Sequence, residues 1–205
     1  MYTKRLIQVL ALLLLIFSGG SGCLAAEEGK KATWDKAEEL LLEGNFEEAV
    51  KLYSLAIETN PDHPDLYLAY YNRGQAFVSL DRFDDALFDF EKSVELNPEF
   101  KDGYKTKGIL NLNMGNYDAA LADFTRLTEL APDDPYAFAN KGTANSLLGN
   151  FEEALLNYNR AIELDPKCAE CYYNRYQVLM ILGRDGEAAS DLEKAGALDN
   201  RYLKP

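Results

Sequence analysis

GNYDAA at residues 115–120 and GNFEEA at residues 149–154 repeat one pattern at a spacing of 34 residues. GNFEEA also occurs at residues 44–49, and DRFDDA at residues 81–86 is a fourth copy. In each copy an aromatic residue follows the last alanine by four positions, and a proline follows eight positions later. These residues are Tyr53, Phe90, Phe124 and Tyr158, then Pro61, Pro98, Pro132 and Pro166. A period of this length predicts a stacked array of similar supersecondary units.

Each unit has two apolar stripes of helical period separated by the repeated stretch, which predicts a pair of helices. Asn45 with Glu48, and Asn150 with Glu153, have the spacing of capping boxes at the start of the second helix. Because one helix pair cannot bury its apolar stripes alone, neighbouring pairs are expected to stack into a solenoid. Glycines with positive φ are expected where the first helix ends, at Gly44, Gly115, Gly149 and Gly183.

These features resemble the tetratricopeptide repeat family, whose pattern is W-x2-L-G-x2-Y, then A-x3-F, then P. The resemblance implies an all-α solenoid of about five helix-turn-helix repeats that forms a right-handed superhelical arc. The fifth repeat departs from the pattern at Tyr176, Asp185 and Asn200, which replace the helix glycine, the turn aromatic and the proline. The repeats cover residues 30–63, 67–100, 101–134, 135–168 and 169–202, before a tail of residues 203–205.

A basic residue precedes the helix glycine position of repeats two to five, and a potential partner follows sixteen residues later. We expect ion pairs between the two helices of a repeat, exposed to solvent and worth ~0–1 kcal/mol each. The alternative is that these charges stay solvated and unpaired. The base of the fourth repeat, Lys141, has Asn157 at this spacing instead of an acid. The predicted pairs are Arg73–Asp89, Lys107–Asp123 and Arg175–Asp191.

In the tetratricopeptide family the first helix of each pair lines a concave side, where extended peptides or partner helices bind. Only three of the twenty side chains at these positions in repeats two to five are charged, so the acidity of the chain lies mainly elsewhere. The resemblance implies a peptide-binding groove. We call its twelve candidates the inner-face residues: Tyr71, Asn72, Gln75, Lys105, Thr106, Asn113, Tyr136, Asn140, Thr143, Tyr173, Asn174 and Gln177.

Asn72, Asn140 and Asn174 share one repeat position, which Thr106 interrupts. They resemble part of the asparagine ladder that peptide-binding members, such as the O-linked N-acetylglucosamine transferase repeats, use to hold backbone amides. An amide side chain suits this task because it both donates and accepts hydrogen bonds. The alternative is that asparagine at this position is common in the family whatever is bound.

The inner face does not resemble the carboxylate clamp by which chaperone cofactors hold an acidic C-terminal peptide. If Lys105 and Asn140 began such a clamp, its final lysine and arginine would fall at Glu170 and Asn174. The sequence therefore disfavours binding of chaperone tails.

The composition argues against several functional classes. The 34 acidic and 21 basic residues give a net charge of −13, whereas nucleic-acid binders need positive charge against phosphates. His63 is the single histidine, and the chain has no glycine-rich phosphate loop, serine elbow or HExxH motif. We expect a non-catalytic protein without cofactor or bound metal that binds no nucleic acid.

The first 22 residues predict export. Lys4 and Arg5 precede an apolar run over residues 6–17, which as a helix would span ~18 Å, short of the ~30 Å hydrocarbon core. This pattern is typical of a secretory signal peptide, and an uncleaved anchor is the alternative. Residues 20–23 resemble the lipoprotein box, which implies a diacylglyceryl group on Cys23 and a linker through residue 29. Ordinary cleavage near residues 25–26 would instead give a periplasmic or secreted soluble protein.

Cys168 and Cys171 form a C-x-x-C motif at the turn into the fifth repeat. If Cys23 carries lipid, the remaining pair suits an oxidising compartment. Three alternatives stay open: a structural disulfide, inert thiols between repeats, or an active redox or intermolecular metal site.

The sequence thus predicts an adaptor of the cell envelope, anchored to the membrane by lipid, that binds a peptide segment of a partner protein. One alternative is a thiol-redox or thiol-metal protein that uses Cys168 and Cys171. The other is a self-assembling structural protein, a homo-oligomer, because no polar capping helix follows repeat five.

Overall fold

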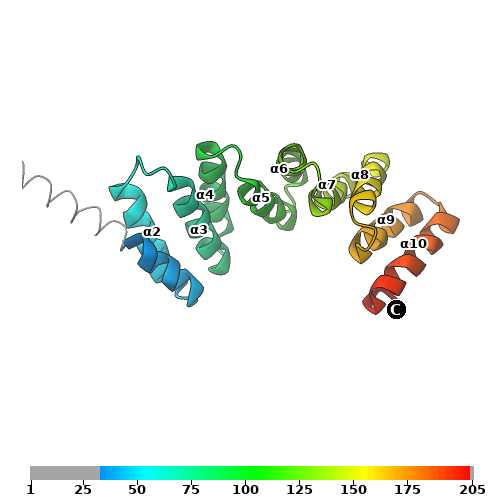
Figure 1. Cartoon of the computed structure of the whole chain (residues 1–205), viewed down its shortest axis with the longest axis horizontal. Helices are drawn as coiled ribbons and strands as arrows, with labels where there is room; N and C mark the ends of the chain where they lie inside the picture. Colours follow the sequence, from blue (N-terminus) through cyan, green and yellow to red (C-terminus); the bar gives the residue numbers. More distant parts are fainter. Residues whose placement is uncertain (1–32, 204–205) are drawn as a thin grey trace, which may run out of the picture. The chain divides into compact units, whose positions relative to one another are not determined.

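The computed structural model describes residues 33–203, so the predicted signal peptide, Cys23 and the linker lie outside the described residues. Within this range the chain is an all-α array of ten helices in five pairs, as predicted (Figure 1). None of these helices is both long and apolar enough to cross a bilayer. The helices are residues 33–42, α2 (Phe46–Thr59), α3 (Leu66–Ser79), α4 (Phe83–Leu96), α5 (Lys101–Asn113), α6 (Tyr117–Leu130), α7 (Pro135–Leu147), α8 (Phe151–Leu164), α9 (Ala169–Ile181) and α10 (Asp185–Leu198), followed by the 3-10 helix η1 (Asn200–Leu203).

The chain forms two compact units, and their boundary falls inside α4 between Asp89 and Phe90. The first unit holds the helix at residues 33–42, α2, α3 and the first half of α4. Its core contains the fully buried Ala49, Tyr53 and Ala69. The second unit continues from Phe90 to the C-terminal end. The repeat period alone does not predict this division.

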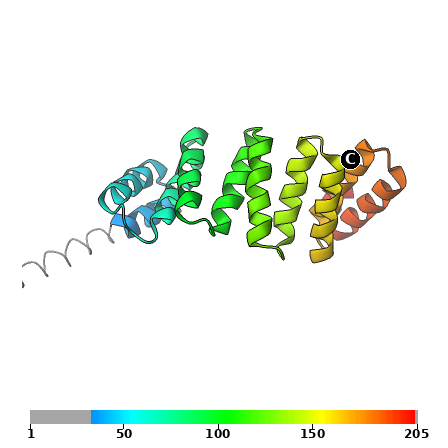
Figure 2. The same ribbon diagram turned by 90° about the horizontal axis from the view of Figure 1, so that it is seen from above.

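In the second unit each helix from α5 to α10 packs against the next one along the chain, and Figure 2 shows α5 to α8 side by side. α5 also contacts α7, and α7 contacts α9. The first helices of successive pairs therefore form one adjoining row, the arrangement that the family implies for the inner side. The second helices supply the core aromatics, such as the buried Phe124 and Tyr158.

Two glycines allow these aromatics to approach the first helices. A Cβ on Gly108 would lie 2.7 Å from the ring of Phe124, and one on Gly142 would lie 2.8 Å from the ring of Tyr158. The four turn glycines adopt positive φ as predicted, with values of 69° to 80°. Asp81 takes the same position in the second repeat with φ 57°.

The capping boxes predicted for α2 and α8 were wrong. Asn45 and Asn150 occupy the N-cap positions, but neither side chain accepts a hydrogen bond from its helix. Their backbone N–H groups donate to carbonyls of the preceding helix, that of Asn150 to the Asn145 carbonyl at 2.9 Å. Because the turn is closed in this way, the amide of Asn45 donates back to the Glu43 carboxylate at 2.9 Å, and that of Asn150 approaches Asn145 Oδ1 at 3.5 Å.

Candidate functional site

The three predicted ion pairs are present, but their carboxylates are buried. Arg73 holds Asp89 through two hydrogen bonds of 2.7 and 2.8 Å, and Arg175 holds Asp191 through two of 2.7 and 2.6 Å. Lys107 Nζ lies 3.0 Å from Asp123 Oδ1. The expectation of exposed pairs was wrong because the carboxylates enter the core, where Asp89 is 0% exposed. An aromatic ring three residues before each base also covers the cation; the rings are Tyr70, Tyr104 and Tyr172.

Each of these bases also reaches the second helix of the preceding repeat. Arg73 donates to Ser54 Oγ at 2.9 Å, and Arg175 donates to Asn159 Oδ1 at 2.6 Å. Lys107 binds the Glu91 carboxylate. A single cation therefore ties three helices together, and its role is to set the position of the first helix on which the inner-face residues lie.

Burial raises the pKa of two of the carboxylates. Loss of solvation raises the pKa of Asp89 and that of Asp123, and the cations Arg73 and Lys107 offset part of this effect. Asn111 also donates to Asp123 at 3.0 Å, which stabilises the ionised form. The ion pairs are thus held against an appreciable cost of burial.

The fourth repeat lacks this arrangement. Asn157 donates to the Glu153 carbonyl at 2.7 Å, and Lys141 forms no ion pair within the described part of the chain. The sequence had indicated this difference, because an amide stands where the other repeats have an acid.

The inner-face residues lie on α3 in the first unit and on α5, α7 and α9 in the second. None of the twelve is buried: Lys105, Asn113, Tyr136 and Gln177 are exposed, and the others are half-buried. The same helices bury small residues on other faces, such as Ala76 on α3 and Ala144 on α7. The side chains selected from the repeat pattern are therefore accessible to a ligand.

The hydrogen bonding of the asparagines differs between the two faces of a helix. On the buried side, Asn111 donates to Asp123, and Asn145 donates to the Lys141 carbonyl at 3.1 Å. On the inner side, the amides of Asn140 and Asn174 have no hydrogen-bond partner among residues 33–203. These two amides are one repeat apart and retain their donors and acceptors.

Thr143 is less available than the neighbouring amide. Its hydroxyl lies 3.1 Å from both the Ala139 carbonyl and the Tyr158 hydroxyl. Burial raises the pKa of Tyr158 to about 12, and the contact with Thr143 opposes this shift. Thr143 thus helps to satisfy a core tyrosine, a role that the repeat pattern did not indicate.

Tyr173 is in contact with two other rings. Tyr202 of η1 stacks on it with ring centroids 4.6 Å apart, and Tyr176 lies 5.7 Å away. Sequence reasoning missed the contact with Tyr202, although Tyr71 and Phe100 stand at the equivalent positions of the second repeat.

Cys168 and Cys171 are joined by a disulfide, with their Cα atoms 5.3 Å apart. Cys168 is the N-cap of α9, and its sulfur accepts a hydrogen bond from the Cys171 N–H at 3.2 Å. Both residues are buried in a cluster with Ala139 and Ala161, between the fourth and fifth repeats. In residues 33–203 no group of three or more metal-ligating side chains comes together.

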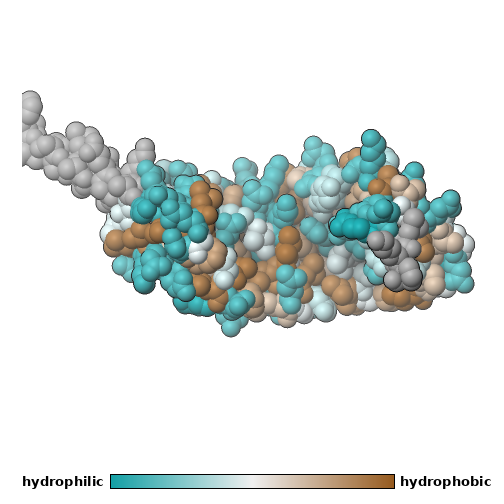
Figure 3. Space-filling model, turned by 90° about the horizontal axis from the view of Figure 1, so that it is seen from below, coloured by the Kyte–Doolittle hydropathy of each residue, from teal (hydrophilic) through white to brown (hydrophobic). Residues whose placement is uncertain are grey.

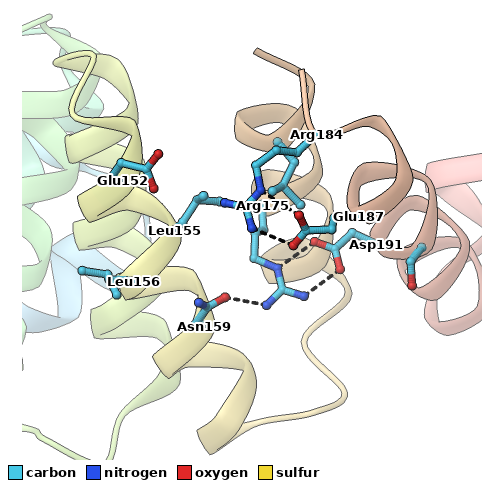
Figure 4. Close-up of a pocket in the computed structure, with 10 residues that line it drawn as sticks. Glu152, Leu155, Leu156, Asn159, Arg175, Arg184, Glu187 and Asp191 are labelled. Carbon is cyan, nitrogen blue, oxygen red and sulfur yellow. Dashed lines mark hydrogen bonds and ion pairs between the residues drawn. The ribbon is translucent and has the colours of Figure 1, made fainter. Parts of the chain in front are cut away.

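A cavity of about 480 Å³ is lined by residues of α8, α9, α10 and the turn before α10 (Figure 4). Its charged groups largely satisfy one another, because Arg175 holds Asp191 and Arg184 forms two hydrogen bonds with Glu187. The sequence did not predict this cavity. The remaining lining residues are Glu152, Leu155, Leu156, Asn159, Leu179 and Ser190.

Exposed apolar side chains do not single out either site. On the face seen in Figure 3, apolar residues lie in patches between polar ones. Leu156, which is 68% exposed, belongs to the cavity, whereas Ile181, which is 62% exposed, lies at the end of α9.

Sequence models of the tetratricopeptide repeat match residues 31–63, 67–100, 104–134 and 135–168, which is more than half of the chain. The chain belongs to the tetratricopeptide repeat family. The matched segments end at residue 168, so the pair α9–α10 is the part of the tetratricopeptide array that departs most from the pattern. Members of this family are protein–protein interaction modules and are typically non-catalytic.

The curated relatives share only a short segment with this tetratricopeptide array. The Hsp70-Hsp90 organizing protein of Triticum aestivum is 42% identical over 69 residues, which are 34% of this chain and 11% of the relative. Heat shock protein STI1 of Saccharomyces cerevisiae is 34% identical over 70 residues, 33% of this chain and 11% of the relative. The matches thus span about a tenth of the length of these proteins.

Solved tetratricopeptide structures match over most of the array. MamA from Desulfovibrio magneticus RS-1 superposes with a TM-score of 0.76 at 22% identity, covering 84% of this chain and 96% of MamA. YrrB, described as a tetratricopeptide protein with an unusual peptide-binding site, superposes with a TM-score of 0.74 at 24% identity, covering 83% of this chain and 87% of YrrB. At these identities the likeness establishes the fold.

Proposed function

We propose that this protein is an exported, membrane-anchored adaptor whose inner face binds an extended peptide segment of a partner protein. The observation that carries the proposal is the pair of free amides of Asn140 and Asn174. Both amides are half-buried rather than buried, so they stay accessible, and they lie one repeat apart on adjoining helices. Each can donate to and accept from the backbone of a bound chain.

The charge of the inner face narrows the class of partner. Lys105 is the one charged residue among the twelve, so the face suits backbone recognition better than the capture of an acidic tail. The curated relatives include Hsp70-Hsp90 organizing proteins, but α9 carries Glu170 and Asn174 where a carboxylate clamp needs bases. Repulsion by Glu170 would weaken the binding of an acidic C-terminus. The peptide-binding site named for YrrB supports a peptide ligand of another kind.

The location outside the cytoplasm rests on separate observations. The basic start, the short apolar run and the small residues before Cys23 favour export and lipid attachment. The disulfide between Cys168 and Cys171 supports the same proposal, because such bonds persist mainly in oxidising compartments. The buried position of both sulfurs disfavours the alternative of a thiol-redox protein.

Site-specific photocrosslinking tests the proposed binding face. The full chain, with p-benzoylphenylalanine in place of the exposed Tyr136, is irradiated in cells of its own source, and the adduct is mapped by mass spectrometry. We expect one partner, crosslinked through one segment. Removing two amides with Asn140→Ala and Asn174→Ala should reduce the adduct about ten-fold, since each lost hydrogen bond costs about 0.5–1.5 kcal/mol.

The matched control is the double variant Glu193→Ala and Lys194→Ala, which alters two exposed residues of α10. This control should leave the adduct unchanged. Equal crosslinking by the asparagine variant and the control would show that the amides do not bind the partner.

A further inference from the structure

Residues 199–203, which form the C-terminal segment described by the structure and are referred to below as the tail, turn back onto the array after α10. The Asp199 N–H donates to the Ala195 carbonyl at 2.8 Å, and the Tyr202 N–H donates to the Asp199 carbonyl at 3.2 Å. η1 then contacts α10, and the ring of Tyr202 stacks on Tyr173 of α9 with an interplanar angle of 30°. Tyr173 is an inner-face residue, so the chain's own tail covers part of the proposed binding face.

The tail presents a cation beside its ring. The Arg201 guanidinium donates to the Asp199 carboxylate at 2.7 Å, yet its side chain is 80% exposed. Hydrogen bonds to Asp199 raise the pKa of Arg201, and the Glu170 carboxylate adds to this effect. Burial raises the pKa of Tyr202, and Glu170 again contributes. Glu170 stands three residues before Tyr173 on α9, so the two side chains lie on the same side of the helix.

The contact with α9 is small. In residues 33–203, Tyr202 is joined to α9 by its ring, whereas the backbone bonds of the turn are internal to residues 195–202. A single aromatic pair shifts an equilibrium by about ten-fold or less. The contact with α9 can therefore open while the backbone bonds between residues 195 and 202 remain.

We infer that Tyr173 and Glu170 form a subsite for an aromatic residue that follows a basic residue, and that Arg201-Tyr202 occupies it until a partner segment of that chemistry displaces it. This inference rests on the proposed function, since it assigns a specificity to the same inner face. The net charge of −13 also favours a basic partner segment.

The occupant in the bound state is a partner segment rather than the tail of a second copy. The chain's own tail is held beside the subsite by a turn of a few residues, which gives an effective concentration in the millimolar range. At micromolar protein concentration a second copy cannot compete with it. A partner segment that also contacts Asn140 and Asn174 gains hydrogen bonds that the tail does not make.

The test uses the full chain and a synthetic peptide with the sequence Asn-Arg-Tyr-Leu-Lys-Pro, which is residues 200–205. Peptide binding is followed by NMR chemical-shift changes at millimolar peptide concentration. The variant Tyr202→Ala should bind the peptide about ten-fold more tightly than the unmodified chain, because its subsite is open. Adding Tyr173→Ala should abolish binding, and adding Glu170→Gln should weaken it two- to five-fold.

Phe88→Ala in the Tyr202→Ala background is the matched control, because it removes an exposed ring of α4 that is not an inner-face residue and should leave peptide binding unchanged. A peptide with alanine in place of tyrosine should not bind. Equal binding by the unmodified chain and Tyr202→Ala would overturn the inference. So would binding that survives Tyr173→Ala.

Two further outcomes would also overturn it. If Tyr202→Ala lowers the melting temperature markedly and binds no peptide, the tail is a structural cap. If the unmodified chain dimerises in sedimentation through Tyr202, the occupant is a second copy. Crosslinking from position 136 does not depend on Tyr202, so failure of the subsite and failure of the proposed function would be told apart.

Discussion

Asp89, Asp123 and Asp191 each lie in the core of a repeat and face a cation held between three helices. A spacing of sixteen residues was enough to predict each partner, because it joins equivalent points on the two helices of a hairpin. Burial could not be predicted in the same way. It depends on the aromatic ring before each base and on polar groups of the preceding repeat, such as Ser54 and Asn159, which are distant in sequence.

The buried pair in the fifth repeat should be important for stability. Asp191→Ala leaves the Arg175 guanidinium half-buried without its carboxylate, and we expect a loss of about 3–5 kcal/mol in the free energy of unfolding. Urea denaturation measures this loss. Glu187→Ala is the comparison, because it removes an exposed carboxylate in the first turn of α10 that pairs with Arg184 on the surface. It should leave the midpoint of urea denaturation almost unchanged. Similar effects of the two variants would contradict the importance of burial.

The raised pKa of Asp123 predicts an unusual dependence of stability on pH. Because the folded state binds the proton more tightly than the unfolded state, the contribution of this group is greatest below the unfolded pKa and is lost as pH rises through the folded pKa. The groups around it are Lys107, Asn111 and Glu91. The unfolding free energy of the unmodified chain minus that of Asp123→Asn should therefore fall as pH rises from about 4. If this difference in unfolding free energy instead rises with pH, the attraction of Lys107 lowers the pKa of Asp123 by more than burial raises it.

At the scale of the helix pair, the sequence predicted the elements and their turns but not every cap. Turn glycines and core aromatics are determined locally, by positive φ at Gly149 and by the four-residue spacing from Ala154 to Tyr158. The capping boxes failed because backbone hydrogen bonds to the preceding helix fix the turn first. The competition between a side chain and such a backbone bond depends on the geometry of the whole turn, which a four-residue motif does not contain.

The close contact between helices predicts a contrast between two glycine variants. In Gly142→Ala the new methyl group would meet the buried ring of Tyr158 at 2.8 Å, and we expect a destabilisation of about 1–3 kcal/mol. Gly186 lies in the first turn of α10 with nothing within 4 Å of its Cβ position, so Gly186→Ala should stabilise by about 0.4–1 kcal/mol. Thermal unfolding of both variants checks this. Equal shifts would show that Tyr158 relaxes to accept the methyl group.

At the scale of the whole molecule, regular repeats could be predicted and their exceptions could not. The fold-back of η1 and the cavity beside α10 arise in the fifth repeat, which departs from the pattern, whereas the boundary between the two units falls inside the regular second repeat. In the first four repeats the structural role of a residue can be predicted, because equivalent residues recur at the same repeat position. At residues 200–203 the backbone bonds of the turn and the stacking of Tyr202 on Tyr173 set the arrangement, and this aromatic pair has the spacing of Tyr71 and Phe100 in the second repeat.

If the proposed lipid anchor is correct, a single residue should control attachment to the membrane. We expect the mature protein to begin at Cys23, to carry a diacylglyceryl group there and to sediment with membranes, because two or more acyl chains give stable attachment. Cys23→Ala should move the protein to the soluble fraction or leave the precursor uncleaved, with loss of label from an alkyne fatty acid. Cys171→Ser is the control, since it removes a different cysteine and should keep the label. Labelling that persists in Cys23→Ala, or a mature N-terminus near residues 25–26, would show that the protein is exported without lipid and would restrict the adaptor to soluble partners.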